Sequence, residues 1–272
     1  MHEDTSPTMF ALESWYQNAP QLDATAFAVA LEKALGKIDI VSSSENSWTF
    51  ALRDYPIQTD DGKNIFAMLS LMRPDHEQPF DHEARRSALE QSWDYPDAAT
   101  ELQNSRHSLL IHELLARTLP AADRWHIFRH ATRVLVEQTR PQVLYNASSD
   151  SCYNPARWLE NQQNGYHYYG FINVRYYTIA DSEDMLMDTR GLDTFGLPDL
   201  QCHFRDLEPD DIAGLLYNTG IYLMQNGDVI EDGDTLGEDH WRCQRETAII
   251  APEREVLDIC PNPPHAGGDR NP

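Results

Sequence analysis

Residues 185–237 read MLMDTRGLDTFGLPDLQCHFRDLEPDDIAGLLYNTGIYLMQNGDVIEDGDTLG, and this stretch decides the fold that the sequence predicts. In its middle, apolar and polar residues alternate, with Leu200, Cys202 and Phe204 sharing one side. A period of two residues indicates a strand with one buried face. We therefore expect a half-buried strand here, with Cys202 in the core.

A helix and a returning strand follow in the same chain segment. Pro209 begins the helix and Asn226-Gly227 ends it, because Gly and Asn adopt the left-handed conformation at low cost. Asp232-Gly233 has the residues of a type I′ hairpin turn, and residues 241–250 are the expected returning strand. The inward stripe of the helix recurs at three-and-four spacing: Ile212, Leu215, Leu216, Thr219 and Leu223.

Outside this stretch, the same patterns predict further helices and strands. Phe27, Leu31 and Leu35 share one helical face, and Gly36 ends that helix. Strands joined by hairpins alternate with strands joined through helices, which favours an α+β fold. We expect two ferredoxin-like α/β lobes with mixed antiparallel sheets packed against helices. The remaining strands are expected at residues 10–16, 48–52, 65–72, 108–115, 142–147 and 168–180, and helices at residues 85–93, 121–138 and 154–162.

The expected domain organisation has three parts. Residues 1–100 form an N-terminal α+β lobe, and residues 101–260 form a C-terminal α+β lobe that contains the stretch quoted above. Residues 261–272 hold four prolines and two glycines in twelve positions. Such a composition disfavours regular elements, so a flexible tail is expected.

The quoted stretch resembles the C-terminal region of a bacterial family known as domain of unknown function 4261. In that family a G-L-x-x-x-G-L-P-D-x-x-x-H-like block precedes a helix and an N-G-D-x-I-x-D-G-x-T hairpin. Residues 106–112, 241–252 and 256–270 are also similar to it. The resemblance implies no chemistry and no catalytic residues. The matching residues are Asp188, Gly191, Leu192, Gly196, Leu197, Pro198, Asp199, His203, Gly227, Asp228, Asp232, Gly233 and Thr235.

The chain is strongly acidic, with 21 Lys and Arg against 44 Asp and Glu in 272 residues, a net charge of −23. This charge argues against direct binding of nucleic acid, which needs a large basic footprint. Residues 181–239 hold sixteen acidic side chains against Arg190 and Arg205, a net charge of −14. We interpret this region as an acidic lobe suited to a basic partner. Residues 106–140 are mildly basic.

The sequence also predicts where the chain resides. It begins with the acidic residues Glu3 and Asp4, and it has no apolar run of the roughly 20 residues that a membrane span requires. A cytoplasmic location without membrane association is expected. Four cysteines without a C-x-x-C pair indicate core residues in a reducing compartment, not disulfides or zinc ligands.

Several motif-like patterns fail as metal sites. Asp228, Asp232 and Asp239 match positions one, five and twelve of a calcium loop, but position three is Ile230. His112 begins an H-E-x-x-H-like pattern that lacks its second histidine. A third pair, His126 and His130, lies four apart on a predicted helix without a third ligand indicated by spacing. No metal or cofactor is therefore predicted.

The sequence lacks phosphate-binding loops, dinucleotide fingerprints and nucleophile elbows. Adjacency of Cys202 and His203 on a strand places them on opposite faces, which disfavours a catalytic cysteine. No catalytic residue is assigned, and a non-enzymatic role is favoured over an enzymatic one.

Two functions remain open. The first is an acidic cytosolic protein-binding module, such as a toxin-immunity or secretion-accessory protein, that binds a basic partner. Its expected partner-binding residues are Asp228, Glu231, Asp232, Asp234, Glu238 and Asp239. The alternative is a hydrolase-like enzyme with a site around His203 in a groove between the lobes, formed by Asp188, Arg190, Asp199 and His203.

Overall fold

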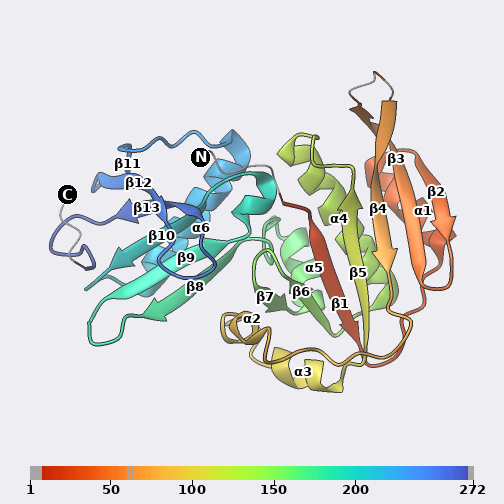
Figure 1. The fold of residues 1–272 in the computed structure, drawn as a ribbon, viewed down its shortest axis with the longest axis horizontal. Coiled ribbons are helices and arrows are strands. Elements are labelled where there is room, and N and C mark those ends of the chain that lie inside the picture. The colour runs from red at the N-terminus through yellow and green to blue at the C-terminus, as the bar shows by residue number, and fades with distance from the viewer. Residues whose placement is uncertain (1–7, 60–61, 63, 269–272) are drawn as a thin grey trace. The chain divides into compact units, whose positions relative to one another are not determined.

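The structure is a computed structural model in which residues 8–59, 62 and 64–268 are described. Its contacts divide the chain into two compact units, Met1–Gly170 and Phe171–Pro272, called unit 1 and unit 2 below. Each unit combines helices with one β-sheet, seven-stranded in unit 1 and six-stranded in unit 2 (Figure 1). The α+β class expected from the sequence is confirmed.

The division after Gly170 differs from the boundary near residue 100 that we predicted. The reason is β5 (His107–Leu114), which pairs with both β1 (Ala11–Tyr16) and β4 (Asn64–Met72). These pairings join residues on both sides of position 100 into one sheet. Strand pairing over long sequence distances is not visible in local patterns, and no linker composition marks either position.

The sheet of unit 1 is antiparallel in every pair, in the order β2-β3-β4-β5-β1-β6-β7. The predicted helices at residues 121–138 and 154–162 are confirmed to within one residue, whereas β2, α3 and β7 were not predicted. The remaining elements of unit 1 are α1 (Ala24–Leu35), β2 (Ile38–Ser43), β3 (Ser47–Gln58), α2 (Arg86–Glu90), α3 (Ala98–Asn104), α4 (Ala121–Thr139), β6 (Val143–Asn146), β7 (Ser151–Tyr153) and α5 (Pro155–Gln163).

Helices cover both faces of this sheet. The Asp23 side chain caps α1 by accepting hydrogen bonds from two backbone amides, and Gly36 at φ +74° ends the helix. Helix α1 contacts α4 and β3, and Phe10 stacks on Phe128 of α4. On the opposite face, Trp15 joins a buried cluster with residues of α2 and α3. Successive side chains along β1 point to opposite faces of the sheet, which keeps these two apolar layers apart.

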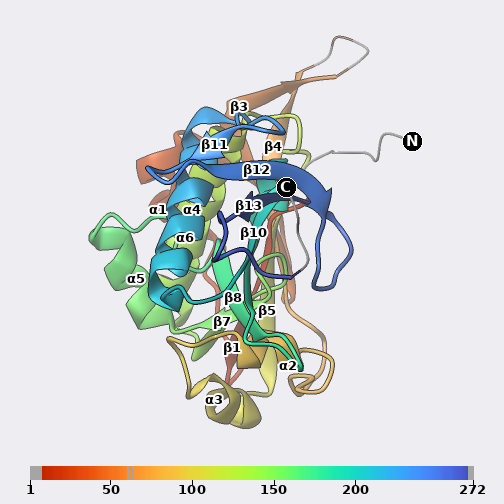
Figure 2. The ribbon, with the colours of Figure 1, turned by 90° about the vertical axis from the view of Figure 1, so that its left-hand side faces the viewer.

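Unit 2 has the sheet order β11-β12-β13-β10-β9-β8, in which β10 and β13 are parallel and the other pairs are antiparallel. Helix α6 contacts β8, β9 and β10 and lies alongside β8 and β10 in Figure 2. The elements are β8 (Asn173–Thr178), β9 (Met185–Arg190), a 3-10 helix η1 (Leu192–Phe195), β10 (Asp199–Phe204), α6 (Pro209–Asn226), β11 (Thr235–Leu236), β12 (Trp241–Thr247) and β13 (Glu255–Cys260).

The predicted strand and helix of the quoted stretch are confirmed, but the hairpin is displaced. Helix α6 begins at Pro209, ends before Gly227 and buries all of its predicted stripe except Leu215, which is half-buried. The β11–β12 hairpin turns at residues 237–240, not at Asp232-Gly233. Gly233 instead donates its backbone amide to Cys243 O at 2.8 Å, so this turn lies against β12.

Two further expectations are corrected. Neither unit, over the residues that the structure describes, has the β-α-β-β-α-β order of a ferredoxin-like lobe: extra strands intervene in unit 1, and α6 is the single α-helix of unit 2. The expected flexible tail is docked as far as Gly268: Ala266 bridges Phe204, and Arg205 N donates to His265 O at 3.0 Å. Residues 269–272 lie outside the described residues.

Among the described residues, no helix is both long and apolar enough to cross a membrane.

Candidate functional site

The sheet of unit 2 has one apolar face and one polar face. Strand register sets Arg175, Asp188, Gln201 and Asp258 side by side on neighbouring strands. Because side chains alternate along a strand, this row lies on the face opposite Cys202. Each of the four is at most 2% exposed. Buried charges are costly unless paired, so the partners of this row decide what it does.

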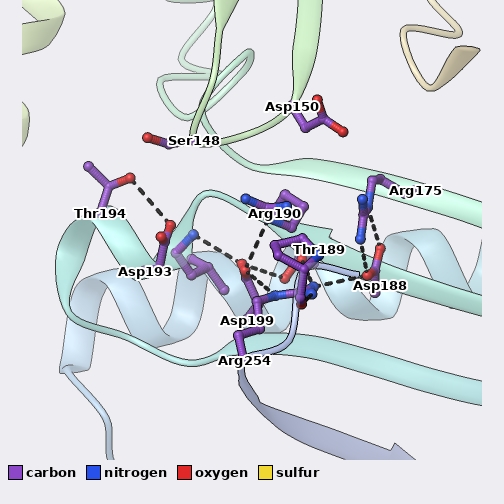
Figure 3. Close-up of polar contacts among 12 residues, drawn as sticks. Ser148, Asp150, Arg175, Asp188, Thr189, Arg190, Asp193, Thr194, Asp199 and Arg254 are labelled. Carbon is purple, nitrogen blue, oxygen red and sulfur yellow. Dashed lines mark hydrogen bonds and ion pairs between the residues drawn. The ribbon is translucent and has the colours of Figure 1, made fainter. Parts of the chain in front are cut away.

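Arginines hold both buried aspartates of the family-like stretch (Figure 3). Asp188 Oδ1 accepts from Arg175 Nε at 2.8 Å, and Asp188 Oδ2 accepts from Arg254 Nη2 at 2.9 Å. Arg254 Nε donates to Asp199 Oδ2 at 3.0 Å, and Arg190 Nε lies 3.7 Å from the same oxygen. Arg254 therefore bridges the two carboxylates.

Backbone and hydroxyl groups satisfy the rest of Asp199. Its Oδ1 accepts from Leu192 N at 3.2 Å and from Thr189 Oγ1 at 3.3 Å. Burial raises the pKa of Asp199 to about 6, and the attraction of Arg254 and Arg190 opposes this rise. Arg254 thus compensates a carboxylate that the fold has removed from water.

The loop between β12 and β13 closes over this face of the sheet. Ile249 N donates to Gln201 Oε1 at 3.0 Å, and Arg175 Nη2 donates to Ala251 O at 3.4 Å. Arg254 Nη1 donates to Ile250 O at 3.1 Å. The arginines therefore bind the loop as well as the aspartates. The carboxylates of Asp188 and Asp199 already accept hydrogen bonds from these arginines. This favours a structural role for the network.

A second charged cluster fastens the C-terminal segment. His203 Nε2 lies 3.2 Å from Asp184 Oδ2, and Arg205 Nε lies 3.0 Å from Asp184 Oδ1. Gly268 N donates to Asp184 Oδ2 at 2.6 Å, and Gly267 N donates to His203 O at 3.0 Å. Burial raises the pKa of Asp184, but the Gly268 amide and Arg205 outweigh it and hold the pKa below its ordinary value.

The residues of the predicted alternative site are thus divided. Asp188, Arg190 and Asp199 converge through Arg254, whereas the ion pair of His203 is with Asp184. Two arginines that hold these aspartates, Arg175 and Arg254, were not among the predicted site residues. One signal was available for Arg175, a charged residue within an otherwise apolar extended run. None pointed to Arg254, which follows Pro252 in a loop.

The predicted partner-binding residues lie together on one exposed segment. Residues 228–239, called the acidic segment below, run from the end of α6 through β11 into the turn of the β11–β12 hairpin. Cys243 N donates to Asp234 O at 2.7 Å, and Arg245 N donates to Asp232 Oδ1 at 2.9 Å. These bonds fix part of the segment to β12. The exposed carboxylates are those of Asp228, Glu231, Asp232, Asp234, Glu238 and Asp239.

The other acidic residues of 181–239 lie elsewhere, which corrects the expectation of a single acidic lobe. Asp184, Asp188 and Asp199 are buried in the ion networks described above. Glu183 and Glu208 are exposed at the end of the sheet where β9 begins beside the end of β10. Helix α6, with 18 residues at about 1.5 Å each, separates Glu208 from the acidic segment by roughly 27 Å.

A family model covers the whole acidic segment and the buried network except Arg175. Residues 188–260 match the model of DUF4261, a domain of unknown function. The resemblance found in the sequence is confirmed. The matched region begins at Asp188 and includes Arg254. No curated protein and no solved structure matches the chain.

Within residues 8–59, 62 and 64–268, no group of three or more His, Cys, Asp or Glu side chains could hold a metal ion. The four cysteines are free, and Cys202 is buried.

Proposed function

We propose that the chain is a non-enzymatic binding module whose acidic segment, residues 228–239, binds a basic protein partner. A bacterial cytoplasmic toxin-immunity or secretion-accessory protein is the specific form of this role that we favour. The single observation that carries the proposal is a set of exposed carboxylates on a loop fixed to β12 by main-chain hydrogen bonds.

The geometry of the acidic segment supports binding because hydrogen bonds already hold part of the segment in one conformation. Asp234 Oδ2 accepts from Glu231 N at 2.9 Å, and Asp232 accepts from the amide of Arg245. A loop held in one conformation loses less entropy when a partner docks. Glu231, Glu238 and Asp239 are exposed and can meet lysines or arginines of the partner.

Charge adds a kinetic advantage. The net charge of −23 attracts a basic protein at long range, and complementary charge accelerates encounter more than it tightens the complex. A fast, salt-sensitive association is therefore expected.

Two exposed apolar side chains lie close to the carboxylates along the chain and can add apolar contact area to an interface. Tyr222, near the end of α6, and Val229, within the acidic segment, are each 48% exposed. Interfaces commonly combine such a centre with a polar rim, and tyrosine is enriched there. A partner is expected to cover these two side chains with apolar surface.

The enzymatic alternative receives less support. A catalytic carboxylate must reach a substrate, but Asp188 and Asp199 are each 1% exposed and bound by arginines. Gly267 lies so close to His203 that a Cβ atom there would overlap the imidazole ring. These contacts favour an architectural role for the residues of that alternative site.

The test compares two charge-reversal variants in cross-linked capture from the cells that make this protein. The first carries Glu231→Lys, Glu238→Lys and Asp239→Lys. The matched control carries Glu183→Lys, Glu208→Lys and Glu253→Lys, three exposed positions of unit 2 outside the acidic segment. Both variants change the net charge equally. A difference in partner capture between them therefore shows that the position of the charges matters, not their number.

We expect one basic protein to be captured by the wild type and by the control, and to be lost from the acidic-segment variant. At about 1 kcal/mol for each reversed surface charge, the purified pair should bind roughly 100-fold more weakly. Equal capture by both variants, or capture of an acidic protein by a different surface, would refute the proposal.

A further inference from the structure

A basic concavity in unit 1 lies outside everything assigned above. It is formed between α4 and α5 and has a volume of about 120 Å³. A cavity needs roughly 10–15 Å³ of such volume to hold one water, so this concavity has room for several waters. Its lining residues are Arg129, His130, Arg133, Leu159, Gln162 and Gln163. Two arginines and a histidine converge here in a chain with more than twice as many acidic as basic residues.

Arg129 is the centre of this cluster. Its Nη1 lies 2.8 Å from His167 Nδ1, and its Nη2 lies 3.3 Å from His130 Nε2. A guanidinium is always a donor, so both imidazole nitrogens must accept and both rings are neutral in this arrangement. The two imidazole rings thus accept hydrogen bonds from Arg129 N–H groups that could instead donate to a bound anion.

The chain positions these groups through ordinary packing. His126, His130 and Arg133 recur at four- and three-residue spacing on α4 and share one face. His167 follows α5, where Gln162 Nε2 donates to its carbonyl oxygen at 3.2 Å. The rings of His126 and His130 have centroids 4.5 Å apart, and His126 Nε2 lies 3.3 Å from the carbonyl oxygen of Ala34.

Burial and the repulsion between Arg129 and Arg133 disfavour any further positive charge in the cluster. Burial and the positive charges of Arg129, His126, Arg133 and His167 lower the pKa of His130 to about 4. Burial and Arg129 lower the pKa of His167. Burial also lowers the pKa of Arg129, and Arg133 adds to this effect while Tyr168 opposes it. A bound anion would relieve this repulsion.

The remaining charged groups on the packed helices do not neutralise the centre of the cluster. Glu137 pairs with Arg133 at 2.8 Å, but both side chains are about half exposed, and such pairs contribute little. The other charged side chains of α1 and α5 are exposed: Glu32, Lys33, Arg157 and Glu160.

We propose that this concavity binds a phosphate group, held by Arg129 and Arg133 and by His130 and His167 as they become protonated. Guanidinium groups match the geometry of phosphate oxygens and bind them through paired hydrogen bonds. Protonation turns each accepting imidazole nitrogen into a donor. The site therefore takes up protons when it is filled, and it binds an anion of constant charge more tightly as the pH falls.

The experiment measures binding of inorganic phosphate and of adenosine 5′-monophosphate to the full chain by titration calorimetry. The test variant is Arg129→Gln with Arg133→Gln. The matched control is Arg117→Gln with Arg140→Gln, two exposed arginines outside the concavity, which changes the net charge equally. Circular dichroism establishes that both variants are folded, as expected for exposed or half-exposed positions.

We expect phosphate binding to weaken about 10-fold to 100-fold in the test variant and to remain unchanged in the control. Tighter binding of the nucleotide than of inorganic phosphate would assign the site to a phosphate monoester, and equal binding would assign it to the free anion. No binding of either probe, or equal weakening in both variants, would overturn the proposal.

A second readout uses sulfate, which stays doubly charged across the titration. Its bound charge should raise the pKa of His130 by about one to three units, observed by NMR of the imidazole carbons. An unchanged His130 pKa in saturating sulfate would also overturn the proposal.

Discussion

Removal of the Arg254 guanidinium should leave Asp199 as a poorly compensated buried charge. In the Arg254→Met variant, Asp199 keeps Arg190 at 3.7 Å and two neutral donors but loses the 3.0 Å bond from Arg254 Nε. Breaking a buried pair on one side costs about 3–5 kcal/mol. Because Arg190 remains nearby, we expect about 3 kcal/mol, measured by urea unfolding near neutral pH.

The same reasoning predicts a rescue. Asp199→Asn in the Arg254→Met background removes the uncompensated charge while its side-chain oxygen can still accept from Leu192 N. The double variant should therefore be more stable than the sum of the single effects predicts, by about 2 kcal/mol. Simple additivity of the two substitutions would refute the view that Arg254 serves to compensate Asp199.

Two further predictions concern unit 2. The pKa of Asp199 is about 6 in the fold against an ordinary 3.8, so its contribution to stability is full below 3.8 and is lost as the pH rises through 6. The stability of Asp199→Asn relative to the wild type should therefore improve by about 3 kcal/mol across this interval, as measured by urea unfolding at a series of pH values; a constant difference would contradict this. Gly267→Ala should release the C-terminal segment, because its Cβ would overlap His203. Faster amide exchange of Gly268 and Arg205 would be the sign, and unchanged exchange would refute the packing argument.

The parts of the fold that could be predicted are those governed by local chemistry. The Gly36 stop of α1, and the Pro209 start and Gly227 stop of α6, act within a few residues of each helix end. The Asp232-Gly233 turn was misassigned because its residues fit two turns equally well. Its backbone bond to Cys243, ten residues away, decides between them.

The buried charge network could not be predicted, for a physical reason. Asp188 and Asp199 read as ordinary polar residues because their burial depends on Arg254, 66 and 55 residues further along the chain. Strand pairing brings these groups together, and no spacing rule encodes it. The acidic segment was identified correctly as exposed because charge density on a loop is itself a local property.

We infer that the buried carboxylates of Asp188 and Asp199 hold unit 2 together, whereas the exposed carboxylates of Glu231, Glu238 and Asp239 bind the partner. The most direct test of this claim is the association rate of the captured partner, measured by stopped flow as the ionic strength rises. We predict that the wild-type rate falls at least about tenfold as screening shortens the Debye length, and that the Glu231→Lys, Glu238→Lys and Asp239→Lys variant associates slowly at every salt concentration. A wild-type rate that is independent of salt, or one that equals the rate of this variant, would contradict the account.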